Sequence, residues 1–163
     1  MSEADPRVQA RATAVALLAR REHSRAELLR KLKSKGHDET VSSQVIDELG
    51  GADWQNDERF VSDFVRSRTN RGWGPQRILF ALRERGIAGS LLKSCLQHQD
   101  FDLRIFETYT RKYGSGAPAT TREAGACARF LAQRGYTQEQ IRKLFKQLAL
   151  SAFDTIDELS EHE

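Results

Sequence analysis

The distribution of apolar residues predicts helices along almost the whole chain, and one helix pattern occurs three times. In each copy, two adjacent apolar residues precede a third at helical spacing, and a glycine stands four positions further on. The copies are Leu28-Leu29-x-x-Leu32-x-x-x-Gly36, Ile78-Leu79-x-x-Leu82-x-x-x-Gly86 and Cys127-Ala128-x-x-Leu131-x-x-x-Gly135. This spacing forms one face of an amphipathic helix, and glycine suits the left-handed position that commonly ends a helix. We therefore predict three glycine-capped helices about fifty residues apart.

Further apolar positions predict one helix before and one after each glycine-capped helix. The preceding helices are expected at Val8 to Glu22, Asp57 to Asn70 and Phe101 to Tyr113. Matching offsets after the glycines are occupied by Val45, Ile46 and Leu49, by Cys95 and Leu96, and by Leu144, Phe145 and Leu148. A short helix cannot bury its apolar face alone, so three helices close a small core and neighbouring units stack. The predicted fold is all-α: three tandem three-helix, helix-turn-helix-like repeats forming an elongated curved array.

Local signals set the expected boundaries. Ser24 and Glu27 match a capping box, and Pro75 stands at a first-turn position where its missing N–H is harmless. We expect a disordered arm over residues 1–7, repeats over 8–50, 51–99 and 100–150, and an acidic tail over 151–163 that frays. Nothing approaches the roughly 18 consecutive apolar residues of a membrane span, and no signal-peptide pattern is present. A cytoplasmic location is expected.

Basic residues are concentrated in the predicted repeats. All 26 Lys and Arg residues lie between residues 7 and 150, and only Arg7 falls outside the repeats, whereas the last thirteen residues carry five acidic residues and no Lys or Arg. This division suggests a polyanionic partner, and a solvated surface with a disordered tail explains the charges equally well. The candidate partner- or nucleic-acid-binding residues are Arg20, Arg21, Arg25, Lys31, Arg66, Arg71, Arg77, Arg85, Arg129, Arg142 and Lys146.

Motifs of catalysis or cofactor binding do not occur in the sequence. It contains no Gly-rich phosphate loop, no His-Glu-x-x-His and no Gly-x-Ser-x-Gly. We predict that the protein is not an enzyme and uses no metal or cofactor. The histidines (His23, His37, His98 and His162) fall at predicted helix ends or in the tail, so we interpret each as an exposed end residue. Cys95 and Cys127 occupy core positions of the repeat and are interpreted as small core residues rather than reactive thiols.

Three aromatic residues do not fit the predicted cores. Phe80 lies nearly opposite Ile78 and Leu82 on a helical wheel. We favour packing of Phe80 between adjacent repeats, with an exposed anchor for a partner as the alternative. Trp54 and Trp73 lie at repeat junctions and are interpreted as junction core rather than as base-stacking platforms.

The sequence resembles the RecX family, regulators of the bacterial recombinase RecA. The middle repeat carries the most specific residues: Asp57-Glu58-Arg59-Phe60, Phe64-Val65-Arg66-Ser67-Arg68 and Gly72-x-Gly74-Pro75-x-x-Ile78-x-x-x-Leu82-x-x-x-Gly86-Ile87. The first repeat adds Ala14 to Leu18 and Ser24-x-x-Glu27-Leu28-x-x-Lys31-Leu32-x-x-Lys35-Gly36. The likeness covers about residues 10 to 150 and is weaker in the third repeat.

The resemblance implies a monomer that binds in the groove of the RecA–DNA filament and inhibits its recombinase, ATPase and coprotease activities. DNA repair and the SOS response would be modulated through this inhibition, and DNA itself would be bound weakly through the basic faces. A second hypothesis is a helix-turn-helix transcriptional regulator that reads a specific DNA site. That function requires base-reading side chains on a recognition helix and usually a dimer, and neither can be identified in the sequence.

Overall fold

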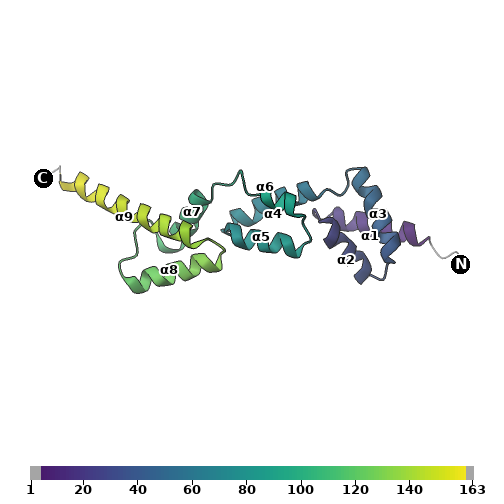
Figure 1. Cartoon of the computed structure of the whole chain (residues 1–163), viewed down its shortest axis with the longest axis horizontal. Helices are drawn as coiled ribbons and strands as arrows, with labels where there is room; N and C mark the ends of the chain where they lie inside the picture. Colours follow the sequence, from purple (N-terminus) through teal and green to yellow (C-terminus); the bar gives the residue numbers. More distant parts are fainter. Residues whose placement is uncertain (1–4, 161–163) are drawn as a thin grey trace. The chain divides into compact units, whose positions relative to one another are not determined.

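The computed structural model describes the backbone of residues 5–160 and the side chains of residues 5–150. Over this range the chain forms nine helices and no strand, which confirms the all-α prediction (Figure 1). The described residues fall into two compact units. Unit 1 consists of the residues up to Arg66 together with Ala81–Gln97, and unit 2 consists of Ser67–Phe80 together with the residues from His98 onward.

The first repeat is a three-helix bundle within unit 1. Its helices are α1 (Pro6–Leu18), α2 (Arg25–Ser34) and α3 (Glu39–Gly51), each of which contacts the other two. The core consists of Ala10, Ala14, Leu28, Leu32, Val45, Ile46 and Leu49. The apolar positions predicted for the second and third helices are therefore confirmed. Helix α1 begins two residues before, and ends four residues before, the predicted bounds of Val8 and Glu22.

The second repeat contains α4 (Asp57–Asn70), α5 (Pro75–Glu84) and the short α6 (Gly89–Ser94). Helix α4 has the predicted bounds, and its predicted apolar face of Phe60, Val61, Phe64 and Val65 is buried. Helix α6 has only six residues and ends before Cys95 and Leu96, both of which are half-buried. The prediction that Cys95 fills a core position, as Val45 does in the first repeat, is therefore wrong.

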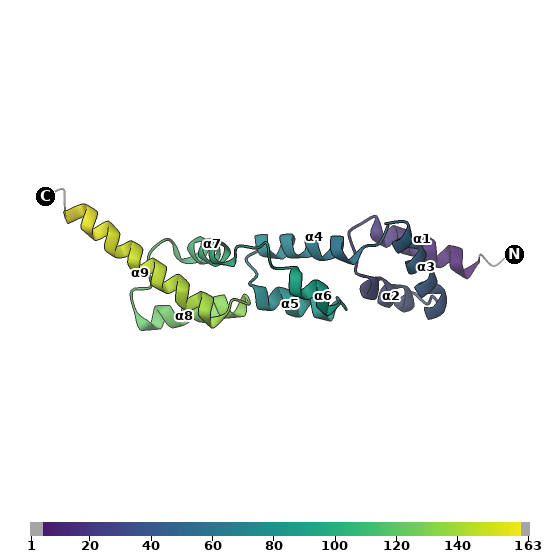
Figure 2. The same ribbon diagram turned by 45° about the horizontal axis from the view of Figure 1, so that its top comes forward.

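The third repeat lies within unit 2 and contains α7 (Phe101–Tyr113), α8 (Thr121–Gln133) and α9 (Gln138–Ser160). Helix α7 has the predicted bounds. The core consists of Ile105, Tyr109, Cys127, Leu131, Tyr136, Ile141, Leu144 and Leu148. Figures 1 and 2 show the ribbon of α9 extending past those of α7 and α8. The backbone is thus helical up to Ser160, ten residues into the segment expected to fray.

The repeated glycines occupy the backbone conformation expected of them. The φ angles of Gly36, Gly86 and Gly135 are +87°, +71° and +93°, a left-handed region that side chains with a Cβ enter at a cost. In each repeat the N–H of the following residue donates to the carbonyl five positions back, for example from His37 to Leu32 at 3.1 Å. This hydrogen bond reverses the chain immediately after each helix.

Candidate partner-binding surfaces

In unit 1, the end of α5 lies against the beginning of α2. The Ser24 hydroxyl donates to the carbonyl of Arg85 at 2.7 Å and accepts from the Glu27 N–H at 3.1 Å. A Cβ added to Gly86 would lie 2.5 Å from the Cβ of Ala26, so the glycine permits this close approach. The capping residue predicted from sequence therefore has a second role, because it also holds a turn 61 residues away.

In unit 2, the end of α8 contacts the beginning of α5 in an equivalent way. The N–H of Gly74 donates to the carbonyl of Arg134 at 2.7 Å, and that of Gln76 donates to the carbonyl of Gly135 at 3.0 Å. A Cβ on Gly135 would lie 2.4 Å from the Cβ of Arg77. The first N–H groups and the last carbonyls of a helix lack hydrogen-bond partners within that helix. Here the N–H groups at the start of α5 and the carbonyls at the end of α8 bond to one another. We call these two contacts the repeat junctions.

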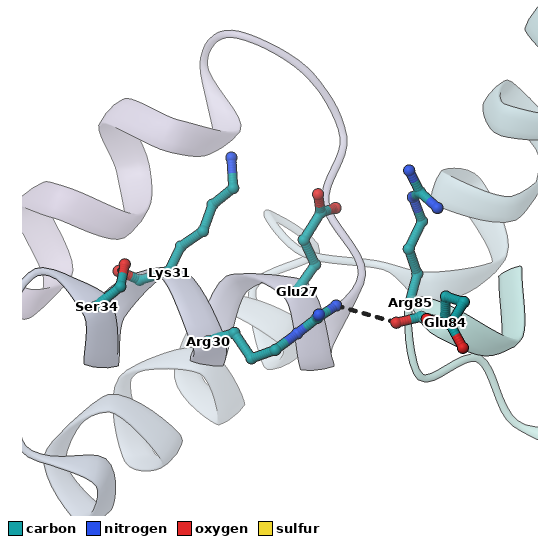
Figure 3. Close-up of a pocket in the computed structure, with 6 residues that line it drawn as sticks. All are labelled: Glu27, Arg30, Lys31, Ser34, Glu84 and Arg85. Carbon is teal, nitrogen blue, oxygen red and sulfur yellow. Dashed lines mark hydrogen bonds between the residues drawn. The ribbon is translucent and has the colours of Figure 1, made fainter. Parts of the chain in front are cut away.

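An open pocket adjoins the repeat junction of unit 1 (Figure 3). It has a cavity volume of about 420 Å³. Its lining residues are Glu27, Arg30, Lys31, Ser34, Glu84 and Arg85. Arg30 reaches across to the carbonyl of Glu84 at 3.2 Å, and the side chains of Lys31 and Arg85 extend to the same side as Glu27 (Figure 3). Two predicted cations, Lys31 and Arg85, are thus brought together, and Arg30 is an addition.

Of the two acidic side chains that line this pocket, Glu27 is already neutralised. Burial opposes ionisation of Glu27, but the hydrogen bond and charge of Arg21 outweigh burial and hold the pKa of the Glu27 carboxyl below its ordinary value. Two Arg21 nitrogens donate to this carboxylate, at 2.6 and 3.1 Å. Arg21 therefore has a structural role in addition to the binding role predicted from sequence. Lys31 and Arg85 remain as the positive charges on the open side of the pocket.

The predicted cations divide into two groups according to their contacts. Five make internal contacts: Arg21 with Glu27, Arg25 with Asp47, Arg66 with Asp63, Arg77 over the ring of Trp73, and Arg85 with the carbonyl of Ala81. Among residues 5–150, the side chains of six predicted cations form no ion pair and no hydrogen bond, although the backbone carbonyls of Lys31 and Arg71 accept from Ser34 and Arg134; the six are Arg20, Lys31, Arg71, Arg129, Arg142 and Lys146. Arg20 lines a second open pocket, between α1 and α2, together with Lys35. We call these six the free cations.

Several predictions of burial are corrected by the structure. His23 is only 2% exposed, so its interpretation as an exposed end residue is wrong, and burial lowers its pKa although the Arg21 carbonyl opposes this. Trp54 is 52% exposed and is not junction core. Phe80 is 63% exposed, so its packing between repeats is also wrong and the alternative of an exposed side chain applies.

The interpretation of Cys127 as a core residue is confirmed, since it is 3% exposed. Burial raises the pKa of the Cys127 thiol despite its hydrogen bond to Tyr113, which disfavours a reactive thiolate. His162 lies outside the described residues. Within the described part of the chain, no three His, Cys, Asp or Glu side chains are placed to hold a metal ion. No described helix is both long and apolar enough to cross a membrane.

The fold and these surfaces define an all-helical repeat protein with cations displayed on both units. Sequence models described as RecX, first three-helix domain, and RecX, second three-helix domain, match residues 10–49 and 56–96. Regulatory protein RecX of Halorhodospira halophila (strain DSM 244 / SL1) is 40% identical over 97% of this chain and 97% of that protein. Regulatory protein RecX of Pseudomonas entomophila (strain L48) is 36% identical over 86% of this chain and 92% of that protein. The chain belongs to the RecX family.

Solved structures show the same fold at lower identity. The crystal structure of RecX from Lactobacillus salivarius superposes with a TM-score of 0.75 at 22% identity, covering 91% of this chain and 99% of that one. A second crystal structure, of regulatory protein RecX, gives 0.71 at 19% identity, covering 88% and 73%. The relatives are named regulatory proteins rather than enzymes.

Proposed function

We propose that this protein binds in the groove of the RecA–DNA filament and inhibits the recombinase, ATPase and coprotease activities of RecA. It acts as a cytoplasmic monomer, and its effect on DNA repair and the SOS response follows from this inhibition. The observation that carries the proposal is the match to a named regulatory protein RecX over 97% of both chains. The family resemblance supplies the partner.

The distribution of the free cations supports this proposal. Arg20 and Lys31 belong to unit 1, whereas Arg71, Arg129, Arg142 and Lys146 belong to unit 2. Cations without internal partners can contact phosphates or carboxylates without first breaking an ion pair. Contacts from both units would add their binding energies through a high effective concentration, and a polymer offers many equivalent sites. We therefore propose the free cations as the main contacts with the filament. The predicted cations that have internal partners are proposed as secondary contacts.

The test is to add the protein to RecA assembled on single-stranded DNA and to follow ATP hydrolysis and filament length. Inhibition at substoichiometric protein is expected, because one bound molecule acts on a run of protomers. A repressor-cleavage assay under the same conditions measures the coprotease activity. Unchanged hydrolysis, length and cleavage at equimolar protein and physiological salt would contradict the proposal.

Matched variants test the contribution of the free cations. Lys31→Gln with Arg142→Gln removes two free cations, one from each unit, and is expected to weaken inhibition about tenfold. Lys33→Gln with Lys143→Gln is the control, because these neighbours on the same helices already pair with Glu39 and Asp102. The control is expected to stay within about twofold, since exposed ion pairs contribute little. Equal losses in both variants would mean that net charge alone, rather than the free cations, is responsible.

A further inference from the structure

Helix α7 carries an apolar stripe that the core of the third repeat leaves partly exposed. Leu103, Phe106 and Tyr113 are 49%, 39% and 37% exposed. Their spacing of three and seven residues, with Thr110 between the last two, places all four side chains on one side of α7. Ile105 and Tyr109, which point into the core, lie on the adjoining side of the same helix, where the ring of Tyr109 borders that of Tyr113. We call Leu103, Phe106, Thr110 and Tyr113 the α7 stripe.

The acidic side chains of α7 are paired, whereas the cations in its last turn are not. The acids of α7 are engaged: Asp102 pairs with Lys143, and Glu107 pairs with Arg104 at 3.0 Å. Asp100 precedes the helix and accepts from the N–H of Leu103. The last turn carries two cations, Arg111 and Lys112, and neither forms an ion pair with another described side chain. The stripe therefore ends in uncompensated positive charge.

The aromatic end of the stripe is held in place, as expected of an anchoring residue. The ring of Tyr113 lies 5.4 Å from that of Tyr109 and 5.7 Å from that of Phe130, measured between ring centres. The ammonium of Lys112 lies 4.0 Å from the centre of the Phe130 ring and 5.2 Å from that of Tyr113. A ring fixed by its neighbours loses little conformational freedom on binding, which favours tight contact.

The geometry points to the α7 stripe as a docking site for a protein segment that presents apolar side chains next to carboxylates. This inference rests on the proposed function and specifies one of its contacts: the segment belongs to a protomer of the filament. In this arrangement, apolar side chains of the bound segment cover Leu103, Phe106 and Tyr113. Carboxylates of the same segment pair with Arg111 and Lys112. Such an arrangement of apolar anchors bordered by Arg is typical of the residues that dominate binding energy at interfaces.

The size of the stripe distinguishes this partner from a second copy of the chain. The exposed parts of Leu103, Phe106 and Tyr113 amount to on the order of 250 Å². A stable pair of proteins buries about 800 Å² on each partner. The α7 stripe is therefore too small to hold a dimer on its own, and it suits one anchor among several contacts repeated along a polymer.

The test compares four variants for co-sedimentation with RecA filaments on single-stranded DNA, each checked for its helix content by circular dichroism. Leu103→Ala with Phe106→Ala removes two stripe anchors from positions where alanine preserves the helix. Trp54→Ala removes a similarly exposed apolar side chain from unit 1 and is its control. Arg111→Glu reverses a charge in the last turn of α7, and Arg122→Glu reverses one at the exposed start of α8.

The double alanine variant is expected to bind at least about tenfold more weakly. Arg111→Glu is expected to weaken binding several-fold, with a smaller effect at high salt, while both controls stay within about twofold. If wild-type protein binds the filament and the stripe variants bind as well as their controls, the docking role of the α7 stripe is overturned and the proposed function stands. If wild-type protein does not bind, both are overturned. A concentration-dependent dimer in sedimentation equilibrium that the double alanine variant abolishes would assign the stripe to a second copy and also overturn it.

Discussion

The three repeated glycines allow the stabilities of the repeat junctions to be measured separately from the cost of the glycine turn. Gly36, Gly86 and Gly135 hold the same position in their repeats, with φ angles between +71° and +93°. Their surroundings differ. An added Cβ meets nothing within 4 Å at Gly36, whereas at Gly135 it would lie 2.5 Å from the backbone nitrogen of Arg77. Substitution by alanine at Gly36 therefore reports backbone strain alone.

The expected magnitudes follow from these distances. A left-handed alanine costs about 1–2 kcal/mol, and its restriction of the unfolded chain returns about 0.4–1 kcal/mol, so Gly36→Ala is expected to destabilise by about 1 kcal/mol. Gly135→Ala carries the same strain and must also open the junction by about 1 Å to restore normal contact distances. Opening it weakens the hydrogen bonds from Gly74 and Gln76, each contributing about 1 kcal/mol. The total for Gly135→Ala is about 3 kcal/mol.

Gly86→Ala provides an internal rescue, because its clash is with a side-chain methyl group. The Cβ of Ala26 lies 2.5 Å from the position of the new Cβ, so Ala26→Gly removes the obstacle. Glycine near the start of α2 costs less than about 1 kcal/mol by itself. The double variant is expected to be more stable than the sum of the single effects by about 1–2 kcal/mol.

Urea denaturation followed by circular dichroism at the helix band measures all of these variants. A difference of 1 kcal/mol corresponds to about 2–4 °C in Tm for a chain of this length, so thermal unfolding gives a second estimate. Equal losses for Gly36→Ala and Gly135→Ala would refute the role assigned to the junction in unit 2. Additive effects of Gly86→Ala and Ala26→Gly would refute the contact in unit 1.

Three further predictions concern titration, charge and shape. Burial lowers the pKa of His23, so at mildly acidic pH the unfolded chain takes up a proton that the folded chain does not. The free energy of unfolding should therefore keep its full value above about pH 6.5 and decrease below it. Between about pH 7.5 and about 5.5, thermal unfolding should show a smaller loss of stability for His23→Gln than for wild type or for His98→Gln, the control at an exposed site. Identical pH profiles would contradict this prediction. Deleting residues 151–163 should strengthen nonspecific single-stranded DNA binding by the isolated protein, because this segment carries five acids and no Lys or Arg, and the gain should shrink as salt rises. Equal affinities at low salt would show that the segment does not compete with DNA. Solution scattering should give a maximum dimension larger than that of a compact globule of 18.5 kDa, and a spherical profile would rule out the elongated array.

Local sequence signals predicted the features that depend on neighbouring residues. The glycine turns follow from the left-handed backbone that ends a helix, and the bounds of α4 and α7 follow from apolar spacing within one helix. The cores of the first and third repeats were predictable for the same reason. In each of these cases, the residues that decide the local structure belong to the same helix as the feature or to the turn beside it.

Features that depend on distant residues were missed or misjudged. His23 was taken for an exposed end residue, yet it lies where Trp73 lies fifty positions later, directly before the start of a second helix. Comparing these two positions would have indicated burial. The pairing of Ser24 with Arg85 and the neutralisation of Glu27 by Arg21 depend on tertiary packing that helix periodicity does not report. Arg30 was missed because its hydrogen bond to the carbonyl of Glu84, 54 residues away, also depends on tertiary packing.

The beginnings of the three second helices differ in a way that follows from the repeat junctions. Ser24 and Gly74 each depend on the next repeat, through the carbonyls of Arg85 and Arg134. At the start of α8 both bonds are local: the Thr120 hydroxyl accepts from the N–H of Glu123, as Ser24 does from Glu27, and the Glu123 carboxylate accepts from the N–H of Ala119. This pair of bonds differs from a capping box in that the carboxylate accepts from the residue before Thr120, and it satisfies donors that would otherwise need a partner. Repeat arrays require terminal repeats that do not present an unsatisfied junction. The described hydrogen bonds at the start of α8 are therefore local, whereas the residues before α2 and α5 also bond to the carbonyls of Arg85 and Arg134.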